Sequence, residues 1–156
     1  MQPLRYEDDR QMLVAGLGGD FTQATVLDIP ALWMRFAPHI GKLTDEVGTN
    51  AYGVISGEMT SGTDGFHYLS CVEVKSPSNL PKDFEIFVIP AQRYAVFGHS
   101  SHVSKLGETI GTIWRDWWPK SGHQHAGTPN LIERYSKEFN PETGFGGMEV
   151  WIPIKI

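Results

Sequence analysis

Cysteine and long apolar runs are scarce in this sequence. Its single cysteine, Cys71, cannot form a disulfide within the chain, and its apolar surroundings are typical of a strand with a buried, unreactive thiol. No apolar stretch approaches the ~18 residues that a membrane-spanning helix needs, and the amino terminus is polar and acidic. These features predict a cytoplasmic, soluble protein that does not contact a membrane.

Basic residues are also in deficit. The chain of 156 residues has 13 Lys and Arg against 18 Asp and Glu, a net charge of -5. Because nucleic-acid binding rests on basic groups that neutralise phosphates, we expect no direct contact with nucleic acid. The lysines are scattered, as on a solvated surface.

Metal and phosphate patterns are weak. His99 and His102 stand three apart and His123 and His125 two apart, in loop-like sequence without a nearby cysteine. We expect solvated or capping roles for these side chains. The glycine-rich stretches 16–19 and 144–147 lack the strand-to-helix context of a phosphate-binding loop, and predict a strand end and a hairpin turn. No metal and no other cofactor is predicted.

A helical pattern in the first half recurs about 81 positions later. The apolar residues Ile29, Leu32, Trp33 and Phe36 reappear as Ile110, Ile113, Trp114 and Trp117. This spacing predicts helices over 28–40 and 103–118. Asp28 is expected to cap the first helix and Pro119 to end the second, which is introduced by Ser100, Ser101 and Ser104.

Strand-like runs surround each helix in the same order. One run precedes the helix and two follow it, giving 12–17, 51–56 and 66–74 in the first half and 94–99, 130–139 and 148–154 in the second. Polar, glycine-rich segments join the later pairs at 57–65 and 140–147. Further strands are expected at 84–89 and 4–7.

The repeated units, about 4–76 and 84–156, each have too little apolar surface to fold alone. The sequence therefore predicts one α+β domain over 1–156, in which strand-helix-hairpin units join into one antiparallel sheet of about eight strands. Both main helices should cover one face, related by a pseudo-twofold axis.

Aromatic residues make up 12% of the chain and cluster on the elements that should surround this axis. Grooves at such junctions are common ligand sites. The candidate lining residues are Trp33, Tyr52, Phe66, Tyr68, Trp114, Tyr135 and Trp151. Any of these rings can instead be ordinary core. Strand alternation leaves open whether Trp151 or its neighbours Val150 and Ile152 face inward.

Glu133 is the most informative polar residue. It stands between Leu131 and Tyr135 on one face of a strand. If these apolar neighbours face the helices, the carboxylate does too, and a carboxylate in such a place is costly unless it is paired, hydrogen-bonded or protonated. The alternative is a surface glutamate paired with a cross-strand Lys or Arg.

A carboxylate among aromatic rings matches a flat or hydrophobic cation, because ring faces attract cations and the carboxylate neutralises them. The same group can act as a general acid or base with the hydroxyl of Tyr52, Tyr68 or Tyr135. The sequence therefore favours a small-molecule-binding protein for cationic, amphipathic compounds and leaves a Glu133-dependent hydrolase open.

Several segments in order resemble the GyrI-like family of effector-binding domains, which accompany AraC-type and MerR-type regulators. They are Ile29-Pro30-x-Leu32-Trp33, Tyr52-Gly53-Val54, Ile89-Pro90-Ala91, Tyr94-Ala95-Val96-Phe97, Ile113-Trp114-x-x-Trp117-x-Pro119, Glu133-Arg134-Tyr135 and Met148-Glu149-Val150-Trp151-Ile152-Pro153-Ile154. The similarity spans nearly the whole chain and is strongest to stand-alone integron-associated proteins.

The resemblance implies a duplicated fold that binds cationic lipophilic drugs between its halves, against an acidic residue that aligns with Glu133. It also implies two alternatives. Some members hydrolyse electrophilic small molecules through a glutamate, and one branch inhibits DNA gyrase, so a gyrase or a separate regulator is an alternative partner. Because the strand signal begins within the first dozen residues, we expect no DNA-binding segment before the domain.

Overall fold

The computed structural model describes residues 1–57 and 65–156. Eight antiparallel strands form one sheet in the order β1-β6-β8-β7-β3-β4-β2-β5. They are β1 (Arg5–Asp9), β2 (Met12–Phe21), β3 (Ala51–Ser56), β4 (Phe66–Glu73), β5 (Glu85–Ile89), β6 (Gln92–His99), β7 (Leu131–Tyr135) and β8 (Met148–Ile154). The predicted α+β class and single large sheet are confirmed.

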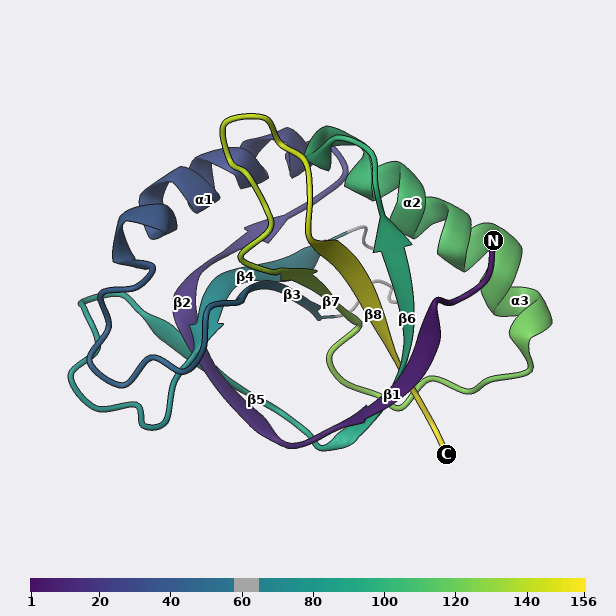
Figure 1. Ribbon diagram of the computed structural model, residues 1–156, viewed down its shortest axis with the longest axis horizontal. Helices are drawn as coiled ribbons and strands as arrows, with labels where there is room; N and C mark the ends of the chain where they lie inside the picture. The colour runs from purple at the N-terminus through teal and green to yellow at the C-terminus, as the bar shows by residue number, and fades with distance from the viewer. Residues whose placement is uncertain (58–64) are drawn as a thin grey trace.

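The two main helical segments lie along the same side of the curved sheet (Figure 1). The first comprises a 3-10 turn at Val26–Asp28, α1 (Ile29–Phe36) and a second 3-10 turn at Ala37–His39. The second begins with a 3-10 turn at Val103–Lys105 and continues through α2 (Leu106–Thr112), a π-helical turn at Ile113–Trp117 and α3 (Trp118–Ser121). In both, the predicted apolar stripe packs on the sheet, with Leu32, Phe36, Ile113 and Trp117 buried.

The ends of these helices differ from the prediction. Asp28 precedes α1 but its side chain makes no capping hydrogen bond, because a 3-10 turn already leads into the helix. At the second segment His102, rather than a serine, accepts the backbone N–H of Ser104. The helix also continues past Pro119 and ends at Gly122, whose φ is 74°. A proline is tolerated there because the π turn places it in the first turn of α3.

The glycine run 16–19 lies inside β2 rather than at a strand end, so that prediction is wrong. A Cβ on Gly16 would lie 1.8 Å from the carbonyl oxygen of Ser70, so glycine lets β2 and β4 approach closely. β7 ends at Tyr135, four residues earlier than predicted. Most of the predicted loop 57–65 falls outside the described residues.

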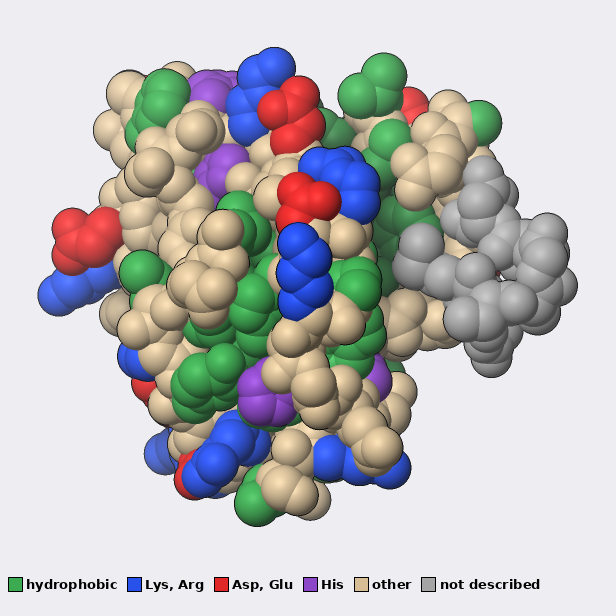
Figure 2. All heavy atoms as spheres, turned by 90° about the vertical axis from the view of Figure 1, so that its right-hand side faces the viewer, with side chains coloured by type: hydrophobic (Ala, Val, Ile, Leu, Met, Phe, Trp, Pro, Cys, Tyr) green, Lys and Arg blue, Asp and Glu red, His purple; other side chains and the backbone are tan. Residues whose placement is uncertain are grey.

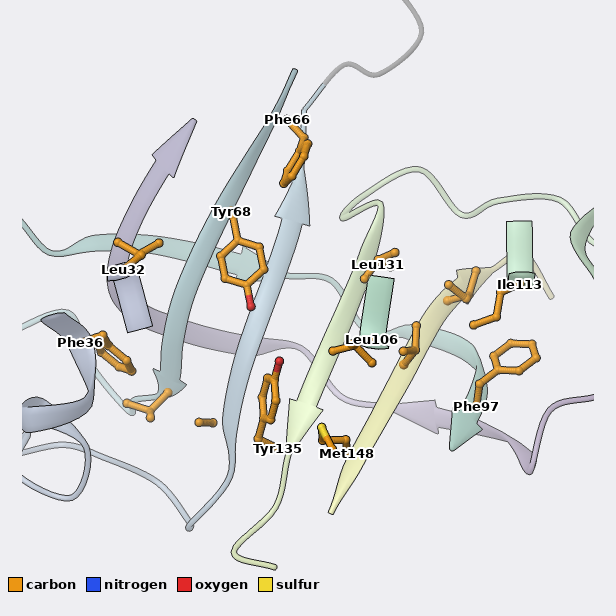
Figure 3. Close-up of a cluster of buried hydrophobic side chains, with 14 of the residues drawn as sticks. Leu32, Phe36, Phe66, Tyr68, Phe97, Leu106, Ile113, Leu131, Tyr135 and Met148 are labelled. Carbon is orange, nitrogen blue, oxygen red and sulfur yellow. The ribbon is translucent and has the colours of Figure 1, made fainter. Parts of the chain in front are cut away.

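The sheet has a core on each face. The helix-side core includes Val150 and Ile152, and the opposite, concave-side core includes Tyr52, Trp151 and the buried thiol of Cys71. Figure 3 shows part of the helix-side core. On the face drawn in Figure 2, basic side chains lie beside acidic ones. Among the described residues, no helix is both long and apolar enough to cross a membrane.

Candidate functional site

A cavity of about 1440 Å³ lies between α1, α2 and the helix side of the sheet. The two helices form its walls, and β3, β4 and β7 contribute to its floor. Its lining is mainly apolar, and Glu133 is the buried charged residue within it. The junction between the two helical segments therefore forms a half-open pocket large enough for a drug-sized molecule.

Glu133 lies at the centre of this floor, on the same face of β7 as Leu131 and Tyr135, as strand alternation predicts. The residue is 7% exposed. Its Oε1 atom accepts hydrogen bonds from the hydroxyls of Tyr68, at 2.6 Å, and Tyr135, at 2.9 Å. Figure 3 shows these two hydroxyls pointing toward one another. The indole Nε1 of Trp33 donates in turn to the Tyr68 hydroxyl at 2.8 Å.

Gly53 provides the room for this cluster. It pairs with Glu133 where β3 of the first unit meets β7 of the second. A Cβ at position 53 would lie 2.1 Å from the Tyr68 hydroxyl oxygen and 2.7 Å from Oε1 of Glu133. The hydrogen-bonded cluster therefore requires a glycine on the neighbouring strand.

The second carboxylate oxygen of Glu133 is differently placed. Among residues 1–57 and 65–156, no side chain or backbone N–H donates to Oε2, and no Lys or Arg lies within 4.0 Å of the carboxylate. Arg134, the next residue, points to the opposite face and pairs with Glu149. The surface ion pair considered from the sequence is therefore wrong, and one oxygen remains for a bound molecule.

Burial controls the ionisation of the cluster. Loss of solvent raises the pKa of Glu133, although the two tyrosine hydroxyls stabilise its charged form. Burial, together with the adjacent carboxylate, raises the pKa of Tyr68 and Tyr135 well above the ordinary value. Both phenols therefore stay protonated and act as donors to the carboxylate.

The structure brings together five of the seven aromatic residues expected at the site. Trp33, Phe66, Tyr68, Trp114 and Tyr135 all line the cavity with Glu133. The first four come from three different elements, and the cluster thus combines both repeated units.

Tyr52 and Trp151 do not line the cavity. The predicted place of Tyr52 is wrong, and the orientation left open at Trp151 is decided in favour of its neighbours Val150 and Ile152. Successive strand residues alternate between faces, so Tyr52 points away from the side that Gly53 occupies. Trp151 lies on the concave side, where the guanidinium groups of Arg5 and Arg134 lie 5.6 and 5.4 Å from its ring centre. Both aromatic residues border a smaller cavity of about 310 Å³ there.

Several cavity residues were not predicted. Gly107 and Gly111 lie on the α2 wall, and His125 lies near Trp114. The Nδ1 atom of His125 accepts the backbone N–H of Gly127, so its Nε2–H donates to the carbonyl of Asn130. The glycines share the helical spacing of Ile110 and Trp114, and that periodicity is the signal that identifies them.

Similar solved structures establish the fold. SAV2435, solved bound to tetraphenylphosphonium, matches 97% of this chain and 93% of its own with a TM-score of 0.74 and 16% identity. An integron cassette protein from Vibrio cholerae matches 99% of this chain and 97% of its own, with a TM-score of 0.64 and 18% identity.

One curated relative is the transcriptional regulator BrlR of Pseudomonas aeruginosa, 30% identical over 132 residues. The match covers 81% of this chain and 46% of the regulator, so the chain spans less than half the length of this relative. The Cass2 family model, described as integron-associated effector binding protein, matches residues 7–154. This match covers nearly the whole chain, and the chain belongs to the family of integron-associated effector binding proteins.

Proposed function

We propose that the cavity binds amphipathic organic cations and that Glu133 supplies the counter-charge. The observation that carries this proposal is the buried carboxylate whose Oε2 atom has no donor among the described residues. A cation placed beside this oxygen would stabilise the ionised form that burial disfavours. The binding free energy would then include the stabilisation of a carboxylate that has no counter-charge among the described residues.

The aromatic lining supports the same ligand class. Trp33, Phe66, Tyr68, Trp114 and Tyr135 would offer ring faces and apolar surface to the ligand. Each cation-ring contact is worth about 0.5 to 2 kcal/mol, depending on how fully the pair is removed from water. A hydrophobic cation gains from both the rings and the carboxylate, whereas an anion of the same shape would meet repulsion.

The relatives support this assignment and a link to gene regulation. The similar protein SAV2435 has tetraphenylphosphonium bound, which is an apolar, permanently charged cation. BrlR is a transcriptional regulator that extends well beyond the region matched here. We therefore assign this chain the role of an effector-binding module for drug-like cations in transcriptional regulation.

Isothermal titration calorimetry with tetraphenylphosphonium tests the role of Glu133. We expect Glu133→Gln to weaken binding by about 30-fold or more, because the amide keeps the shape but removes the charge. Glu149→Gln, on the opposite face, is the matched control and should bind like the wild type. Equal affinities for the wild type and Glu133→Gln would contradict the counter-charge role.

A hydrolase is the second candidate, and the hydrogen-bond chain from Trp33 through Tyr68 to Glu133 favours it. Glu133 would take a proton from a water molecule whose oxygen attacks an electrophilic carbon, while a tyrosine hydroxyl donates to the leaving group. Incubation with a reactive epoxide distinguishes the two functions. Hydrolysis to the diol that is lost in Glu133→Gln would support catalysis, whereas intact epoxide would contradict it.

A further inference from the structure

The two helical walls of the cavity differ in the size of the side chains that they present. In the helical repeat, Val26 and Pro30 of the first unit correspond to Gly107 and Gly111 of the second. All four residues line the cavity. The α1 wall therefore carries side chains at two positions where the α2 wall is bare backbone.

Neither glycine on the α2 wall is required by the ligand-free fold. A Cβ at either position would have no atom within 4 Å outside the local helix, and neither residue has a positive φ. This differs from Gly53, where a Cβ would overlap the Glu133 cluster. Glycine in a helix also lowers helix stability by about 0.5 to 1 kcal/mol relative to alanine. The helix is therefore less stable with glycine at these two positions than it would be with alanine.

The open space in front of these glycines belongs to the cavity that holds Glu133. The carboxylate is buried, lines the same cavity, and leaves Oε2 without a donor among the described residues. This is an independent sign that the space receives a ligand. Trp114, one turn beyond Gly111, extends the same wall with a ring.

We infer that Gly107 and Gly111 form a bay that admits the bulk of the ligand and selects large, three-dimensional cations over small, flat ones. The inference rests on the proposed function and adds a determinant of ligand size. The charged atom of the ligand binds at Glu133. The bulky substituents around that atom occupy the bay on the α2 side. A methyl group at either glycine would take up that space.

Two permanently charged probes of different size test the bay. Tetraphenylphosphonium carries four rings around its charge, and benzyltrimethylammonium carries one. We expect Gly107→Ala/Gly111→Ala to weaken binding of tetraphenylphosphonium by about tenfold or more, because overpacking a formed site is unfavourable. Binding of benzyltrimethylammonium should change less than about twofold.

Stability separates this outcome from misfolding. The double alanine variant should melt about 2 to 8 °C above the wild type, because alanine is the better helix former and meets no clash. Glu108→Ala, on the same helix but outside the cavity lining, is the control and should leave the affinities for both cations unchanged.

The possible results are distinguishable. If the double alanine variant binds both cations more weakly by the same factor, or binds the larger one as tightly as the wild type does, the bay is overturned. A loss of binding in Glu133→Gln would still uphold the counter-charge role in that case. If the wild type binds neither cation, or Glu133→Gln binds both as tightly as the wild type does, the proposed function fails and the bay fails with it.

Discussion

The two repeated units share a fold and differ at the residues that line the cavity. At the seam, the first unit contributes Gly53 and the second contributes Glu133, which pair directly. On the helices the difference is reversed, because Val26 and Pro30 of the first unit correspond to Gly107 and Gly111 of the second. The two halves have the same order of elements and strand pairing, and a few differences between them place a charge at the centre and open space on one side.

The largest expected effect comes from removing the difference at the seam. Gly53→Ala should lower the free energy of unfolding by about 1 to 3 kcal/mol, because the new methyl group overlaps the Tyr68 hydroxyl and the Glu133 carboxylate. Urea unfolding followed by Trp fluorescence measures this. Gly107→Ala is the matched control and should be stabilised. Unchanged stability of Gly53→Ala would contradict the close packing of the cluster.

A smaller effect on stability is expected when either of the two tyrosines, which come from different units, loses its hydroxyl. Tyr68→Phe should destabilise the protein by about 1 to 2 kcal/mol, since it removes one donor to Glu133 and also leaves the Trp33 indole without its acceptor. Tyr135→Phe removes only a donor and should cost about 1 kcal/mol. Chemical denaturation of both variants measures the difference. The reverse order would contradict the chain of hydrogen bonds.

The smallest effect is the pH dependence contributed by Glu133. Burial raises its pKa in the folded state above the ordinary value of 4.5, so the folded protein favours the protonated carboxyl group. The free-energy cost of holding the ionised carboxylate in the folded protein is absent below the unfolded pKa. It is fully present once pH has risen through the folded pKa. Glu133→Gln lacks this cost and should gain stability relative to the wild type as pH rises through the folded pKa of Glu133.

Unfolding of the wild type and Glu133→Gln over a series from pH 4.5 to pH 8 checks this sign. Because the same proton competes with a bound cation, wild-type affinity for tetraphenylphosphonium should fall as pH decreases through the folded pKa. A stability difference that is constant with pH would show that Glu133 titrates alike in both states.

The sequence predicted the scaffold because its signals are local and duplicated. The helical stripe containing Trp33 and Trp114 and the alternation around Glu133 each follow from a simple period in the chain. Tyr52 was misplaced because its face depends on how β3 pairs with β4 and β7, which the composition of the strand does not reveal. Trp151 was left open for the same reason, and the structure assigns the inward face to Val150 and Ile152.

Features that depend on distant contacts were not predicted. The glycine run lies within β2 because β4 packs closely against it, and the backbone of Ser70 leaves no room for a side chain at Gly16. The π turn ahead of Pro119 and the open wall at Gly107 and Gly111 depend on the elements packed around them, so the local sequence does not predict them. Sequence periodicity predicts which way a side chain points. Whether it borders a cavity depends on the side chains of the facing elements.

A crystal structure with tetraphenylarsonium would test the central claim most directly, because the anomalous signal of arsenic locates the cation. We expect one peak between α1 and α2, beside the Glu133 carboxylate and in front of Gly107 and Gly111. A peak in the concave-side cavity bordered by Tyr52 and Trp151, or only on the outer surface, would contradict the assignment.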